Sequence, residues 1–582
     1  MGSITIKDKN CIRASLIGSL ALFYLTSFLC FSQEPSQPVY RVIEELGIKV
    51  AMRDGVRLST DIYRPDAQDK FPALLLRTPY GNGGKGDRDG HFYAQRGYVV
   101  VIQDTRGRYD SEGIFDPMQS EGPDGYDTQE WIGTQSWCNG KIGTFGGSYN
   151  GFTQWMPAPL ANPYLITMFP TKTFSDFYSE AYVGGAFRIL RWSPWSYEMS
   201  RPEIVYRNFV QNMADSAYRV IPLMEQDHLL GWRISFLRDW LAHPQPDLYW
   251  ERSRVGNHYA DIRTSVYHLG GWFDSFQQGT LDNFMKMTAP DIDPEIRVRQ
   301  KLLMGPWVHG SESRLTGDLD FGEDAEIDTR ELELRWFDSQ LKGIENGILE
   351  EPPVRIFVMG ENAWRYENEW PLARTVYREY YFHSNGRANS SRGDGTIDTA
   401  PPKDENPDTF VYDPEDPVLT PGRDEPIDQR VVEARKDVLV YTTGKLAQSI
   451  EVTGPVEVVL YASSSVTNTD FTAKLVDVHP DGKAIRLCEG IIRASFRDPG
   501  VPPSAIQPNK VYQYNISLWS TSNLFMEGHQ ILVEISSSNF PRFDRNLNTG
   551  ISPAQDTASL KATQTIYHSS EYPSCIVLPV IE

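Results

Sequence analysis

The stretch KIGTFGGSYNG, residues 141–151, runs from a short apolar segment into a serine, Ser148, that has glycines close on both sides. The apolar segment predicts a buried strand, and the small neighbours allow a tight strand-to-helix turn that exposes the serine hydroxyl above a sheet. The usual form of this turn has glycine two residues after the serine, where this chain has Asn150. On its own, the motif is consistent with the nucleophile of an α/β-hydrolase or with a glycine-rich turn that carries an inert serine.

Short apolar runs on either side of this stretch predict further strands of one sheet. They are FPALLLRTPYG (71–81), GYVVVIQDTRG (97–107), SVYHLGGWFD (265–274) and KLLMGPWVHG (301–310). Their length, and the helix-length segments between them, are typical of parallel strands in an α/β sheet. Before them, residues 48–65 alternate apolar and polar side chains around Asp54-Gly55, which predicts a hairpin. A helix is expected over residues 331–342, with Gly343 as its C-terminal stop.

Changes in sequence texture divide the chain into four kinds of segment. Residues 1–32 read as a secretory signal, and residues 33–161 and 256–349 as the two parts of an α/β-hydrolase domain. Residues 162–255 carry many aromatic and helix-forming side chains, which predicts a helical insertion that caps the active site. From residue 350 to 582 short alternating strands lie between turn signals, as in an all-β sandwich or jelly-roll domain.

A serine nucleophile needs a histidine base, and the base needs a carboxylate to orient it. In α/β-hydrolases the three residues follow the chain order serine, acid, histidine. Among ten histidines, His309 stands just after a predicted strand, whereas His268 lies inside one and is interpreted as a packed residue. Asp274 ends the preceding strand-like run and falls between Ser148 and His309. We therefore predict the triad Ser148, Asp274 and His309.

An acyl-transfer enzyme also needs donors for the developing oxyanion. The backbone N–H of Tyr149, directly after the nucleophile, is one candidate donor. The second donor usually comes from a loop after an early strand, and Tyr80 in the segment RTPYG occupies such a loop. From spacing alone, a packed aromatic ring at a turn is the better interpretation of Tyr80.

The same segments resemble the X-Pro dipeptidyl-peptidase-like hydrolases, which include cocaine esterase, α-amino-acid ester hydrolases and glutaryl-cephalosporin acylases. The resemblance runs from about residue 45 to the C-terminus and rests on segments such as QDTRGRYDSEG, GGWFDSF, MGPWVHG, DFTAKLVDVHPDGKA and FPRFDRNLNTG. It implies an α/β-hydrolase domain with an inserted helical cap and a C-terminal jelly-roll of the galactose-binding-like kind. It also implies Ser148 as nucleophile, Asp274 as acid, His309 as base, and Tyr80 with the Tyr149 N–H as the oxyanion hole.

The resemblance implies no cofactor and no metal, and it narrows the substrate to a small ester or amide. In α-amino-acid ester hydrolases, carboxylates just after the catalytic acid hold the substrate ammonium group. Here Asp274 is followed by Ser275 and Phe276, so an α-amino acyl group is disfavoured and a neutral one is expected. Alternatives left open are an X-Pro dipeptidyl-peptidase, a glycan esterase of polysaccharide degradation, and a non-catalytic carbohydrate-binding protein on a hydrolase fold.

The net charge indicates which binding partners are disfavoured, and the N-terminal segment indicates where the protein is located. The formal net charge is −21, from 77 acidic and 56 basic residues, which disfavours nucleic acid and anionic membranes as partners. Lys7, Lys9 and Arg13 precede an apolar run over residues 14–31, as in a signal peptide. We expect a secreted or periplasmic protein without stable membrane insertion after cleavage, although a retained anchor and a homo-oligomer both stay open.

Overall fold

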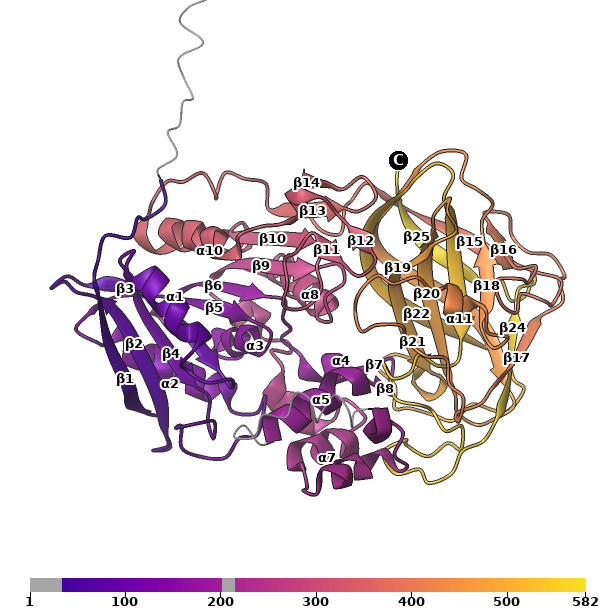
Figure 1. The fold of residues 1–582 in the computed structure, drawn as a ribbon, viewed down its shortest axis with the longest axis horizontal. Coiled ribbons are helices and arrows are strands. Elements are labelled where there is room, and N and C mark those ends of the chain that lie inside the picture. The colour runs from indigo at the N-terminus through magenta and orange to yellow at the C-terminus, as the bar shows by residue number, and fades with distance from the viewer. Residues whose placement is uncertain (1–33, 201–214) are drawn as a thin grey trace, which may run out of the picture.

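The computed structural model describes residues 34–200 and 215–582, so the predicted signal over residues 1–32 lies outside the described residues. Two bodies of strands lie side by side, with a group of helices between them on one side of the molecule (Figure 1). The first body contains a ten-stranded sheet in the order β1-β2-β4-β3-β5-β6-β9-β10-β13-β14. Its strands are β1 Val42–Ala51, β2 Arg57–Pro65, β3 Phe71–Thr78, β4 Val99–Asp104, β5 Cys138–Gly147, β6 Leu165–Thr171, β9 Ser265–Gly271, β10 Gln300–Gly305, β13 Val354–Val358 and β14 Ala363–Glu367.

The central strands of this sheet, from β4 to β13, run parallel, whereas β1, β2 and β14 pair antiparallel at the edges. The predicted parallel runs and the hairpin at Asp54-Gly55 are therefore confirmed. Parallel neighbours need long crossovers, which contain helices α1 Lys85–Ala94, α2 Glu121–Gly133, α3 Tyr149–Trp155, α8 Gln277–Met287, α9 Pro294–Arg297 and α10 Thr329–Phe337. A π-helical turn extends α10 over Asp338–Lys342, and Gly343 ends it at φ 72°, as predicted.

Alternate residues of the central strands face two separate hydrophobic clusters. On β3, Leu75 belongs to the cluster under α2 and α3, whereas Leu74 belongs to the cluster under α1 and α10. This alternation follows from the two-residue period of a strand. Because both faces are covered, the parallel strands are apolar on both sides, which explains their near-continuous apolar sequences.

The helical group between β6 and β9 starts later than predicted. The sequence placed its beginning at residue 162, but β6 lies in the main sheet between β5 and β9, because its apolar residues fill the space between those strands. The elements after Thr171 are α4 Phe177–Ala181, β7 Tyr182–Val183, β8 Ala186–Phe187, α5 Ile189–Ser200, α7 Ser235–Ala242 and the short helices Leu223–Leu230, Leu248–Ser253 and Tyr259–Asp261. Aromatic side chains hold them together, as in the edge-to-face pair of Phe177 and Trp240, whose ring centroids are 4.8 Å apart.

The C-terminal part is a second β body. Its strands are β15 Thr375–His383, β16 Thr396–Asp398, β17 Asp408–Tyr412, β18 Leu439–Thr442, β19 Ile450–Ser464, β20 Asp470–Val478, β21 Ala484–Arg493, β22 Tyr512–Phe525, β23 Gln530–Ser536, β24 Ala562–Tyr567 and β25 Cys575–Ile581. Every strand pair in this body is antiparallel except β16 with β18. The sequence placed the boundary between residues 349 and 350. However, β13 pairs in parallel with β10 and β14 pairs with β13, so the first sheet continues to Glu367.

In the described part of the chain, no helix is long and apolar enough to cross a membrane.

Candidate active site

Ser148 lies at the sharp turn between β5 and α3, in a backbone conformation that few side chains adopt. Its φ and ψ are 60° and −125°, and such a strained conformation is typical of a serine at a strand-to-helix elbow. The turn depends on small neighbours: a Cβ at Gly146 would lie 2.8 Å from the Cβ of Asn150, and one at Gly151 would lie 2.5 Å from the Cβ of Thr173. The position that must lack a side chain is Gly151, because its backbone lies against Thr173. Asn150 can therefore stand where the usual motif has glycine.

Asp274 and His309 form a hydrogen-bonded pair at the carboxyl ends of neighbouring strands. Asp274 follows β9, His309 follows β10, and these strands pair in parallel. The His309 Nδ1 lies 2.8 Å from Asp274 Oδ2, while the other carboxylate oxygen accepts a 2.6 Å hydrogen bond from the Phe276 N–H. Because carboxyl ends of parallel strands meet at one edge of a sheet, Ser148 after β5 shares this edge.

The pair is electrostatically prepared for base catalysis. Burial acts to raise the pKa of Asp274, but the interactions with His309, together with the charge of Lys172 and the Phe276 N–H, hold that pKa below its ordinary value. For His309, burial and the positive charge of Arg191 lower the pKa, although Asp274 opposes both. A lowered histidine pKa keeps the imidazole neutral, which is the form that accepts a proton.

Tyr80 places its hydroxyl against the side chain of Ser148. Its hydroxyl interacts with the Ser148 side chain and accepts a 3.1 Å hydrogen bond from Trp195 Nε1 on α5. Although 41% of the Tyr80 surface is exposed, its hydroxyl end is shielded by these neighbours, and this desolvation raises its pKa. A phenol that keeps its proton remains a hydrogen-bond donor.

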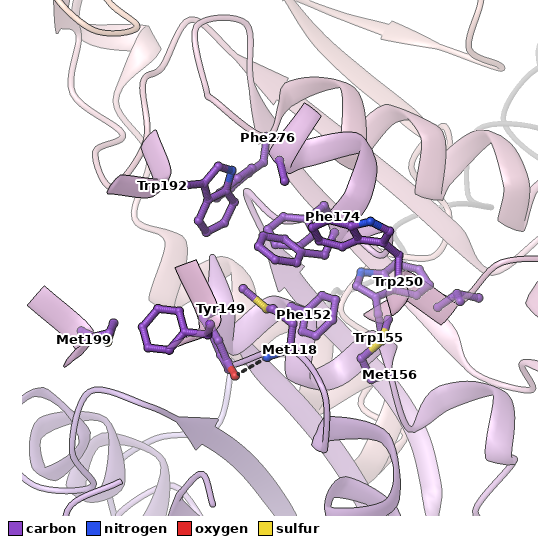
Figure 2. Close-up of a cluster of buried hydrophobic side chains, with 14 of the residues drawn as sticks. Met118, Tyr149, Phe152, Trp155, Met156, Phe174, Trp192, Met199, Trp250 and Phe276 are labelled. Atoms are coloured by element: carbon purple, nitrogen blue, oxygen red, sulfur yellow. Dashed lines mark hydrogen bonds between the residues drawn. The ribbon is translucent and has the colours of Figure 1, made fainter. Parts of the chain in front are cut away.

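The side chain of Tyr149, directly after Ser148, is anchored in the core. As the first residue of α3, Tyr149 has an N–H without an acceptor inside the helix. Its side chain belongs to a cluster of buried apolar residues that includes Phe152, Trp155 and Phe174, and its hydroxyl points toward Met118 (Figure 2). The Tyr149 hydroxyl accepts a 3.0 Å hydrogen bond from the Met118 N–H, drawn as a dashed line in Figure 2.

The structure thus gathers the five predicted residues at one edge of the sheet in two groups. Ser148 contacts Tyr80 and is followed by Tyr149, and His309 contacts Asp274. Across the described ranges, no hydrogen bond joins Ser148 Oγ to His309. Catalytic hydrogen bonds are often long in unliganded enzymes and shorten when substrate binds.

The interpretation of His268 as a packed residue is confirmed. His268 is buried in β9, its Nε2 lies 3.2 Å from Gln300 Oε1, and desolvation lowers its pKa to about 3. The cysteines Cys138, Cys488 and Cys575 are free and buried.

A cavity of 890 Å³ borders the site at Tyr80. Its walls come from loops of the first sheet and from the helical group, and include Gly81, Arg108, Tyr109, Phe115, Met199 and Phe236. A volume of this size can hold a small-molecule ligand.

Metal-compatible side chains cluster at one place in the described ranges 34–200 and 215–582. The ligand atoms of Asp477, His479 and His529 lie within 4.8 Å of one another on the C-terminal β body. The His529 Nδ1 is 2.8 Å from Asp477 Oδ1, a contact that an ordinary hydrogen-bonded pair explains, and we assign no metal there.

Sequence reasoning missed the side chains that the helical group and distant loops bring to the site. Trp195 and Arg191 come from α5, and Phe276 places its ring edge-to-face with His309 at 5.0 Å between centroids. Lys172 donates 2.7 Å hydrogen bonds to the Ser311 carbonyl and to Glu312, which fixes the loop after His309. No local pattern marks these residues, because their partners are far away along the chain.

Comparison with known proteins agrees with this arrangement. Residues 54–311 match the model of the X-Pro dipeptidyl-peptidase (S15 family), and residues 346–577 match that of the X-Pro dipeptidyl-peptidase C-terminal non-catalytic domain. The chain is 38% identical to cocaine esterase from Rhodococcus sp. (strain MB1 Bresler), over 92% of this chain and 98% of that protein.

Two solved structures share the whole architecture of a hydrolase domain with a C-terminal β domain. An aminopeptidase from a marine sediment archaeon (Thaumarchaeota archaeon) has a TM-score of 0.80 and 27% identity, covering 94% of this chain and 98% of its own. An α-amino acid ester hydrolase has a TM-score of 0.78 and 25% identity, covering 96% and 100%. The resemblance drawn from the motifs is therefore confirmed: the chain is a serine hydrolase that belongs to the X-Pro dipeptidyl-peptidase (S15) family, together with cocaine esterase.

Proposed function

We propose that this protein hydrolyses a small-molecule ester or amide through a triad of Ser148, His309 and Asp274 and an acyl-enzyme intermediate. The observation that carries the proposal is the placement of Ser148 at a strained elbow on the sheet edge that also holds the hydrogen-bonded His309–Asp274 pair.

In the proposed first step, His309 takes the Ser148 proton as the hydroxyl oxygen attacks the substrate carbonyl. The Tyr80 hydroxyl and the Tyr149 N–H hold the oxyanion, and His309 then gives the proton to the leaving alcohol or amine. In the second step, His309 deprotonates a water molecule that attacks the acyl-enzyme, and Ser148 is released with its proton. Asp274 keeps the His309 ring in the tautomer that both steps need.

The rival enzymatic proposal is an X-Pro dipeptidyl-peptidase, and the identity to cocaine esterase favours an esterase over it. A glycan esterase would use the same chemistry on an acylated sugar. We further propose that the predicted signal directs secretion or export to a periplasm, and that the C-terminal strands adopt jelly-roll topology. The long pairing of β19 with β22, and of β19 with β25, supports that topology.

The test compares the mature wild-type protein with Ser148→Ala on p-nitrophenyl acetate, p-nitrophenyl butyrate and Gly-Pro-p-nitroanilide. We expect ester hydrolysis that falls by several powers of ten in Ser148→Ala. Ser391→Ala, an exposed serine on the C-terminal body, is the matched control and should keep the wild-type rate.

Circular dichroism and thermal unfolding should show that Ser148→Ala is folded. Retention of the wild-type rate in folded Ser148→Ala would refute the triad. Cleavage of the Gly-Pro anilide in preference to both esters would move the proposal to the peptidase.

A further inference from the structure

An arginine from the helical group, Arg191 on α5, is linked to His309 through the ring of Phe276. Its guanidinium carbon lies 4.5 Å from the centroid of the Phe276 ring, and that ring packs edge-to-face on His309. Asp274 and Tyr80 are among the charged and polar groups that act on the Arg191 guanidinium. The positive charge therefore lies next to the ring that contacts His309, close enough to act on both members of the His309–Asp274 pair.

Arg191 differs from its neighbouring arginines in having neither a hydrogen-bond nor an ion-pair partner among the described residues. Within residues 34–200 and 215–582, no side chain forms an ion pair or hydrogen bond with its guanidinium. By contrast, Arg188 pairs with Glu180 at 2.6 Å, and Arg542 pairs with Glu489 at 2.9 Å. Arg423 donates to the Leu190 carbonyl at 3.2 Å.

The acid with the largest effect on Arg191 is Asp424, but its oxygens already have other donors. Arg542 lies 3.0 Å from Asp424 Oδ1, and the Ser275 hydroxyl lies 3.1 Å from Oδ2. Four arginines and this one aspartate line a small cavity of 10 Å³ between α5 and the C-terminal body, together with Leu190. The positive charge of Arg191 is thus only partly offset by the protein itself.

We propose that Arg191 binds a carboxylate of the substrate, so that the protein acts on esters or amides carrying an anionic carboxylate close to the scissile carbonyl. This inference rests on the proposed function and replaces the neutral substrate that the sequence favoured. The sequence showed that no acid follows Asp274, but it gave no sign that an arginine would enter the site from α5.

The chemistry of the guanidinium supports this class of ligand. Its planar N–H donors match a carboxylate, and such charge-assisted hydrogen bonds are stronger than neutral ones. A neutral substrate would leave the half-buried guanidinium desolvated and unpaired, which is unfavourable. The same arginine can therefore select for an anion and against its uncharged analogue.

The kinetic test uses two matched ester pairs. The first compares the mono-p-nitrophenyl ester of adipate with p-nitrophenyl hexanoate, which places the carboxylate in the acyl part. The second compares the acetyl ester of 3-hydroxybenzoate with phenyl acetate, which places it in the leaving group. We expect kcat/KM to favour the carboxylated member of one pair by about tenfold or more after subtraction of spontaneous hydrolysis.

Variants then connect this preference to Arg191. Arg191→Met should abolish the preference, whereas Arg191→Lys should retain part of it because the charge remains. Arg299→Met is the matched control, since Arg299 is exposed and precedes β10 at the sheet edge opposite to His309. It should keep the wild-type preference.

A binding measurement separates this inference from the proposed function. Calorimetric titration of Ser148→Ala with the carboxylate that matches the preferred pair, monomethyl adipate for the acyl part or 3-hydroxybenzoate for the leaving group, should show binding that weakens about tenfold or more in Ser148→Ala/Arg191→Met, and ethyl hexanoate should bind both proteins equally. Ester hydrolysis without a carboxylate preference in either pair, or equal binding of that carboxylate to both variants, would overturn the role of Arg191 and leave the esterase standing. Carboxylate binding without hydrolysis would refute the esterase and retain the anion site.

Discussion

The hydroxyl of Tyr149 donates a 2.8 Å hydrogen bond to the carboxylate of Glu121, which is buried beneath the nucleophile turn. Glu121 in turn pairs with Arg77 at 2.8 Å, at the carboxyl end of β3. The residue that follows Ser148 is therefore tied through its side chain to α2 and, through Glu121, to β3. This arrangement fixes the direction of the Tyr149 N–H.

Replacing Tyr149 by phenylalanine should therefore destabilise the fold and weaken catalysis together. The change leaves Oε1 of Glu121 and the Met118 N–H without their hydrogen-bond partner in the core, although Arg77 still pairs with Oε2. We expect this loss to lower the free energy of unfolding by about 1–3 kcal/mol. Urea unfolding measures that loss, and kcat should fall because the N–H is less firmly held. Tyr366→Phe, on exposed edge strand β14, should change neither value; equal stability of both variants would contradict the anchoring role.

Tyr80→Phe tests the oxyanion hole. Loss of a single oxyanion donor typically lowers kcat by about 10²–10³, and KM should change little because the ring still packs. The melting temperature should stay near that of the wild type, since Tyr80 is 41% exposed. A rise in KM with unchanged kcat would instead assign Tyr80 to substrate binding.

Asp274→Asn tests the orientation of the base. The amide cannot hold the His309 ring in the required tautomer, so we expect kcat to fall by about 10⁴. Asp291→Asn is a matched control on the exposed segment after α8 and should retain full activity. If Asp274→Asn keeps more than a tenth of the wild-type kcat, another acid must orient His309.

The pH dependence of kcat/KM should report the lowered pKa of His309. The base works only when neutral, so activity is present above this pKa and is lost as pH falls through it. Burial and Arg191 lower the pKa from 6.5, against the opposing effect of Asp274 and Asp424. The midpoint of the acid limb should therefore lie below 6.5, and Arg191→Met should move it upward. An acid limb centred above 6.5 would contradict this electrostatic environment.

The sequence alone determined the frame of the site. Apolar runs predicted the parallel strands, the glycines around Ser148 predicted the elbow, and the positions of Asp274 and His309 after strands gave the chain order of a hydrolase triad. These signals are local, because strand period and backbone strain depend on neighbouring residues. The boundaries between the domains were predicted less well. The sequence placed β6 in the helical insertion and β13 in the C-terminal domain, because the sequence of a short apolar strand does not indicate which sheet it joins.

Only the tertiary structure decided what surrounds the reacting groups. Trp195 meets Tyr80 across 115 positions of the chain, and Arg191 enters from α5 to lie over the ring of Phe276, which packs on His309. Such contacts arise from the packing of the helical group against the sheet and the C-terminal body, which no local pattern specifies. The physical reason is that the sequence shows which side chains are charged, whereas packing in three dimensions decides whether an oppositely charged partner lies next to each of them.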